Sequence, residues 1–166
     1  MTGSFNFVFH LLAFGVLMAS VIALDVLNRK LRAEPDIQRK LYLGGLMKTF
    51  ALFTPFTTVV ILLTGIGNMV NRYGMGGMGN IETWLKVKIV LFVILAFNGS
   101  VIASRFQKKR MMLLKAKADN SAPEDCDRQI SSINRIFTFY YYIQWTLLLA
   151  VVFLSVFGDG KHPGTF

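Results

Sequence analysis

The stretch FNFVFHLLAFGVLMASVIAL, residues 5–24, decides the fold class of this chain, because it contains no charged side chain. At about 1.5 Å per residue, a helix of this length is about 30 Å long, which matches the hydrocarbon core of a bilayer. We therefore predict a membrane-spanning helix. No Lys or Arg precedes Arg29. The basic start of a cleavable signal peptide is missing, so we expect this helix to be retained.

Two further uncharged runs follow at 50–71 and 136–158, and a shorter one lies at 89–104. Only 16% of the residues are charged and 54% are hydrophobic, whereas about a quarter of the residues of a soluble protein are charged. We predict an all-α polytopic membrane protein, an antiparallel bundle of four transmembrane helices in one domain. The expected helices cover about 5–27, 50–70, 83–104 and 136–158.

The positive charges gather in two segments, 28–48 and 105–135, which hold 14 of the 18 Lys and Arg residues. Cytoplasmic loops are rich in these residues. We therefore expect both segments to be cytoplasmic loops and both termini to lie outside, as in a multi-pass protein of a bacterial inner membrane. A net charge of +9 would favour nucleic acid in a soluble protein. Here its distribution indicates topology and contact with the lipid bilayer, and we expect no nucleic-acid partner.

Two ionisable side chains within the expected spans, His10 and Lys88, are candidate functional residues, because such groups are costly to bury in a membrane. His10 stands about five residues into the first helix, and Lys88 about six residues into the third, from the same side of the membrane. We therefore expect them at similar depth. Lys86 is offset from Lys88 by about 200° around the helix, so we expect Lys86 to reach toward the membrane surface. Lys88 shares its predicted interior stripe with Leu91, Leu95, Asn98 and Ile102.

His10 has three interpretations on sequence grounds. It is a histidine hydrogen-bonded to a neighbouring helix, an axial ligand of haem b or a related tetrapyrrole, or a residue that handles protons or copper. The only other histidine, His162, lies in the tail. The single cysteine, Cys126, excludes a zinc site or cluster built from several cysteines. Met69, Met75 and Met78 are a weak signal for copper binding.

The helix-one stretch FHLLAFGVLMAS, residues 9–20, resembles the opening of the HemJ/CopD-like four-helix membrane proteins. The second helix is similar to that family at Arg39, Leu41, Tyr42, Pro55 and Gly65. The stretch WLKVK at 84–88 looks like the family pattern Trp-Leu-His-x-Lys, and Arg135 stands where the last helix of the family carries an arginine. The resemblance implies that His10 and Lys88 face one haem. It also implies oxidation of protoporphyrinogen IX to protoporphyrin IX.

Three functions follow as hypotheses. The first is a membrane protein that binds haem or another tetrapyrrole, through His10 and Lys88, in a redox or porphyrin-related role. The second is a non-catalytic subunit of a larger respiratory or photosynthetic complex, or a homo-oligomer, because the spans show no carboxylate pair and no Ser-His-Asp set. The third is copper handling or transport.

Overall fold

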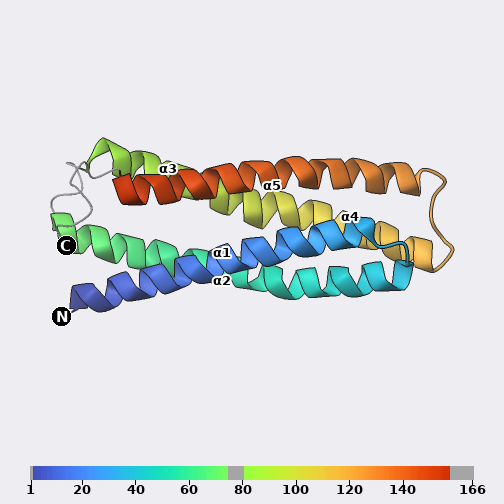
Figure 1. Cartoon of the computed structure of the whole chain (residues 1–166), viewed down its shortest axis with the longest axis horizontal. Helices are drawn as coiled ribbons and strands as arrows, with labels where there is room; N and C mark the ends of the chain where they lie inside the picture. Colours follow the sequence, from blue (N-terminus) through green and yellow to red (C-terminus); the bar gives the residue numbers. More distant parts are fainter. Residues whose placement is uncertain (1, 75–80, 158–166) are drawn as a thin grey trace.

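The computed structural model describes residues 2–74 and 81–157, and the described residues form long helices (Figure 1). The elements are α1 (Thr2–Ala33), α2 (Ile37–Tyr73), α3 (Thr83–Phe97), the π-helix η2 (Asn98–Ala103), α4 (Ser104–Ala118) and α5 (Cys126–Phe157). Because α3, η2 and α4 follow one another without a break, the bundle consists of four helical rods. The all-α prediction is confirmed.

All four rods are long and apolar enough to cross a membrane, so the chain is built as a multi-pass membrane protein. Large apolar side chains are exposed along them, among them Leu12 and Phe56, which are 60% and 69% exposed. Such exposure is costly in water and is ordinary where a helix faces lipid.

The segments expected to be loops, 28–48 and 105–135, are mostly helical instead. The connection between α1 and α2 is only residues 34–36, and that between α4 and α5 is residues 119–125. At the short turn, the Asp36 side chain accepts a hydrogen bond of 2.9 Å from the backbone N–H of Gln38 and so caps α2. Hydropathy marks where apolar sequence ends. It does not mark where a helix ends, because Lys and Arg are good helix formers.

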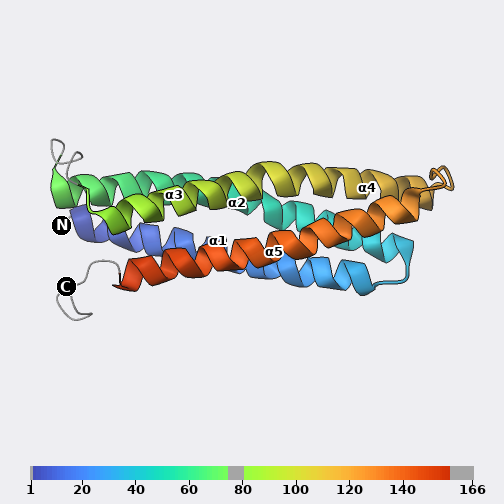
Figure 2. The ribbon, with the colours of Figure 1, turned by 90° about the horizontal axis from the view of Figure 1, so that it is seen from above.

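The helices associate in two pairs, α1 with α2, and the α3–α4 rod with α5 (Figures 1 and 2). The pairs meet in a central apolar layer in which Leu17, Leu95 and Leu148 are at most 1% exposed. We call the end at which α1 begins the N-terminal end. The opposite end, which carries the α1–α2 and α4–α5 connections, is the loop end (Figure 1).

The π-helix η2 changes which face of the third rod is buried. Leu95 and Asn98 are buried, as expected for the stripe that starts at Lys88, but Ile102 is 36% exposed. The expectation for Ile102 was wrong because a π turn accommodates an additional residue. One residue corresponds to about 100° of helix rotation. The stripe therefore leaves the interior after Asn98.

Candidate functional site

A cluster of polar side chains joins α1 to α2 near the N-terminal end of the bundle. His10 Nδ1 lies 2.9 Å from Thr64 Oγ1. One turn earlier on α1, Asn6 Nδ2 donates to the Thr64 carbonyl at 2.8 Å and to Asn68 Oδ1 at 2.7 Å. We call Asn6, His10, Thr64 and Asn68 the N-terminal polar cluster. His10 was a predicted site residue, whereas Asn6 was not singled out in the sequence.

The Thr64 hydroxyl bears on the tautomer of His10. It lies 2.7 Å from the Val60 carbonyl and 3.2 Å from the Ile61 carbonyl, so it can donate within its own helix. When it does so, its oxygen accepts from an imidazole that carries its proton at Nδ1. In that tautomer of the neutral ring, Nε2 keeps its lone pair for another partner.

Two glycines of α2, Gly65 and Gly67, lie where side chains of α1 approach this helix. A Cβ at Gly65 would lie 3.5 Å from His10 Cε1, and a Cβ at Gly67 would lie 2.8 Å from Asn6 Nδ2. The imidazole therefore lies beside Gly65 at a distance that leaves room for ordinary van der Waals contact with a Cβ. At Gly67 a side chain would displace the Asn6 amide, so glycine is needed there for the close approach.

Lys88 lies on α3, in the other helix pair, and is only partly exposed, whereas Lys86 is exposed. Within residues 2–74 and 81–157, no group of three or more His, Cys, Asp and Glu side chains is placed to hold a metal ion. His162, Met75 and Met78 lie outside the described residues.

A second polar cluster, at the loop end, was missed in the sequence. Arg110, expected in the cytoplasmic loop 105–135, is 0% exposed. Its Nη1 donates to Asn28 Oδ1 at 2.7 Å and to Asn134 Oδ1 at 3.1 Å, and its Nη2 donates to Gln107 Oε1 at 2.5 Å. The guanidinium also lies over the Phe137 ring, 4.4 Å from its centroid.

This arginine cluster connects all four rods, since Arg110 Nη2 also lies 3.6 Å from the sulfur of Met47 on α2. The partners of the guanidinium are neutral amides, a sulfur and a ring, and its Nε has no hydrogen-bond partner within the described part of the chain. Arg110 stands directly after Lys108 and Lys109 in a basic run. Nothing local distinguishes it from those exposed neighbours.

Between the two clusters, Asp25 is a buried carboxylate, 7% exposed, on α1. It accepts from Arg29 Nη2 at 2.9 Å and from Trp145 Nε1 of α5 at 3.3 Å. Asp25 is therefore fully engaged within the protein, and it pairs with neither His10 nor Lys88.

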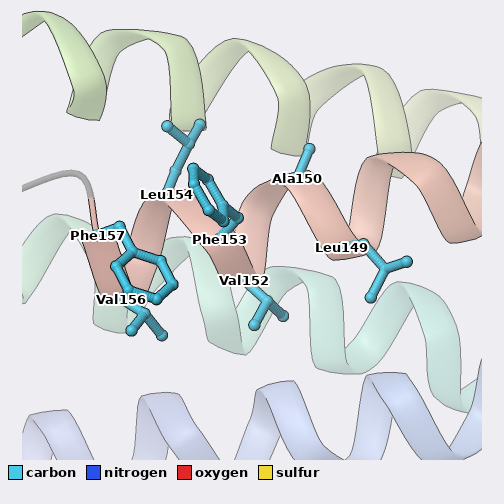
Figure 3. A pocket seen from close by; sticks show the side chains of 7 residues that line it. All are labelled: Leu149, Ala150, Val152, Phe153, Leu154, Val156 and Phe157. Carbon is cyan, nitrogen blue, oxygen red and sulfur yellow. The ribbon is translucent and has the colours of Figure 1, made fainter.

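The N-terminal end also carries a shallow apolar groove of about 670 Å³ on the last turns of α5. Figure 3 shows its side chains spread around the helix, with Leu154 directed toward α3. The rings of Phe153 and Phe157 pack with centroids 4.9 Å apart, and both are more than half exposed. Lining residues are Leu149, Ala150, Val152, Phe153, Leu154, Val156 and Phe157.

In comparisons with known proteins, no family model, no curated protein and no solved structure matches the chain. The resemblance to HemJ/CopD-like proteins, and the roles it implies for His10 and Lys88, therefore stay predictions.

Proposed function

We propose that this protein binds a haem or related tetrapyrrole at the N-terminal end of its bundle, with His10 Nε2 as an axial ligand. The observation that carries the proposal is the hydrogen bond between His10 Nδ1 and the Thr64 hydroxyl. A histidine that ligates a metal usually donates its other ring N–H to a protein acceptor, which fixes the tautomer and aims the lone pair. His10 is held in this way before any ligand binds.

The residues around His10 fit a tetrapyrrole better than a bare metal ion. A bare ion needs several protein ligands, whereas the macrocycle itself supplies four nitrogens and requires only axial ligands from the protein. One partly exposed imidazole, which lies beside Gly65 of α2, meets that requirement. Lys88, from the opposite helix pair, is the second proposed contact, either as an amine ligand or as a cation near the cofactor.

A bound haem would supply one-electron redox chemistry at this end of the membrane. The protein residues then hold and orient it: Thr64 sets the direction of the imidazole, and Gly65 allows the ring to lie against α2. A HemJ-like oxidation of a porphyrinogen is the enzymatic form of this proposal. Electron transfer without substrate turnover is the other form.

The test is a dithionite-reduced minus oxidised absorption spectrum of the protein in mild detergent, as isolated and after loading with haem. We expect a b-type α-band that is lost in His10→Ala. The matched control is His162→Ala, which removes the only other histidine and should leave the spectrum unchanged. A spectrum without a Soret band in folded, haem-loaded protein would sink the proposal.

A subunit role in a larger membrane assembly is the second candidate, and the groove on α5 favours it. A transmembrane helix of a partner, or of a second copy, would cover the exposed Phe153 and Phe157 pair. Gentle solubilisation followed by native sizing should then give a complex, and Phe153→Ala should weaken it. Phe56→Ala, on an equally exposed ring of α2, is the control. A lone monomer under these conditions contradicts this role.

We also propose that the loop end faces the cytoplasm of a bacterial inner membrane, because most of the basic residues lie toward it. Ser121 is exposed in the α4–α5 connection. In a Cys126→Ser background, a Ser121→Cys variant should react with a membrane-impermeant maleimide only after the inner membrane is opened. Labelling of intact spheroplasts would reverse the proposed orientation.

A further inference from the structure

A polar cleft of about 260 Å³ lies between α1 and α5 near the loop end, and neither cluster described above accounts for it. Four of its lining residues carry charged or amide groups: Asp25, Asn28, Arg29 and Arg32. The other four carry aromatic or hydroxyl groups: Thr138, Tyr141, Tyr142 and Trp145. Cavities lined in this way bind small polar groups and orient them with a few convergent donors.

The charges of the cleft do not cancel. Arg29 donates through both Nε and Nη2 to the two oxygens of Asp25, at 3.2 and 2.9 Å, so this pair is neutral. Arg32 stands three residues further along α1, on the same side of the helix as Arg29. It donates only to the uncharged hydroxyl of Thr138, at 2.6 Å. Among the lining residues, one positive charge therefore has no carboxylate partner.

The cleft lies where the chain is expected to leave the hydrocarbon. On α1 it begins at Asp25, directly after the uncharged stretch 5–24. On α5 its lining runs from Trp145 to Thr138, a distance of about 10 Å along the helix. Trp and Tyr side chains favour the level of the lipid glycerol and headgroup. Basic side chains are then positioned at the level of the phosphate.

We propose that this cleft binds the headgroup of an anionic glycerophospholipid, with its phosphodiester held by Arg32 and by the remaining donors of Arg29. In phosphatidylglycerol the phosphodiester is the only charge of the headgroup, and it matches the single unpaired positive charge of the lining. In phosphatidylcholine the choline ammonium beside the phosphodiester balances that charge. Guanidinium groups are well suited to phosphate because they donate two parallel hydrogen bonds. Trp145 and Tyr142 would contact the glycerol end of the lipid. This site is independent of tetrapyrrole binding at the opposite end.

The protein itself carries a reporter for this site, because Trp84 and Trp145 are its only tryptophans. In a Trp84→Phe variant reconstituted into vesicles, the fluorescence of Trp145 reports quenching by lipids brominated on their acyl chains. Brominated phosphatidylglycerol is compared with brominated phosphatidylcholine at equal mole fraction. We expect the anionic lipid to associate about fivefold more strongly, the factor that one basic residue near the surface supplies.

Arg32→Gln should remove this preference, whereas Arg32→Lys should retain most of it. Lys30→Gln is the matched control, because Lys30 is an exposed cation on the same turn of α1 that does not line the cleft. A Trp145→Phe variant, in which Trp84 reports from the other end of the bundle, should show no preference. Circular dichroism checks that each variant is folded.

Three results would overturn the proposal. The first is equal quenching by the two lipids. The second is an equal loss of preference in Lys30→Gln, which would assign it to general surface charge. The third is loss of the preference on adding excess inorganic phosphate, which would make the cleft a site for free phosphate instead of a lipid.

Discussion

The two polar clusters of this bundle differ in how completely the protein uses them. The N-terminal polar cluster joins only α1 and α2, and His10 in it is partly exposed with one ring nitrogen unused. The arginine cluster at the loop end joins all four rods, and Arg110 is fully buried with neutral partners at both terminal nitrogens. A buried side chain that contacts every rod holds the structure together. A group that is held but has an unused ligand position is available for function.

The largest difference between the two clusters is expected when Arg110 is substituted. Arg110→Ala leaves the oxygens of Asn28, Asn134 and Gln107 without their donor in a buried site. We expect a loss of about 3–5 kcal/mol in the free energy of unfolding, because each of three oxygens left without its donor costs about 1–3 kcal/mol when buried. Equilibrium unfolding of the detergent-solubilised protein measures this. Lys109→Ala, at an exposed position of the same helix, should change the value by no more than about 0.5 kcal/mol. Equal effects of the two substitutions would show that Arg110 is not a central contact.

Substitutions of two adjacent glycines of α2, Gly44 and Gly45, test the packing of the loop end. A Cβ at Gly44 would lie 2.2 Å from Met111 Sδ on α4, whereas a Cβ at Gly45 meets nothing within 4 Å. Gly44→Ala forces the flexible end of the Met111 side chain to move, which offsets part of the gain in helix propensity. Gly45→Ala should stabilise the helix by up to about 1 kcal/mol. The thermal unfolding midpoint of Gly45→Ala should therefore be the higher of the two. Equal midpoints would contradict the contact between α2 and α4.

The smallest effect on folding is expected at the N-terminal polar cluster. Thr64→Val removes the acceptor of His10 Nδ1 and should cost only about 0.6 kcal/mol of unfolding free energy, the average for a hydrogen bond between membrane helices. The same change should lower haem affinity about 10–100-fold, because it removes the group that orients the ligand. Haem titration followed by the Soret band measures the affinity. Thr58→Val is the control, since Thr58 bonds only its own helix, at the Thr54 carbonyl. Unchanged affinity in Thr64→Val would remove the orienting role of Thr64.

The helical class and the number of spans were predictable because they depend on local composition. An uncharged stretch such as 5–24 is apolar whatever surrounds it, and a helix satisfies its own backbone hydrogen bonds within one segment. A similar depth for His10 and Lys88 stays a prediction, which follows from counting residues along each helix. The partner of His10 was not predictable in this way. Thr64 lies 54 positions away, and its hydroxyl is one of several on α2.

Only the tertiary structure decided which polar residues are buried and which side chains they contact. Lys108, Lys109 and Arg110 are equivalent as sequence, yet only Arg110 is buried. The difference arises from helix rotation, since consecutive residues point about 100° apart and one of the three faces the other rods. The π-helix η2 sets that rotation for α4. By itself, the sequence determined four apolar helices and the level of each side chain along them. The rotation of each helix and the identity of its neighbours decide whether a charged side chain finds partners or stays available. These two features are set by the packing of the bundle.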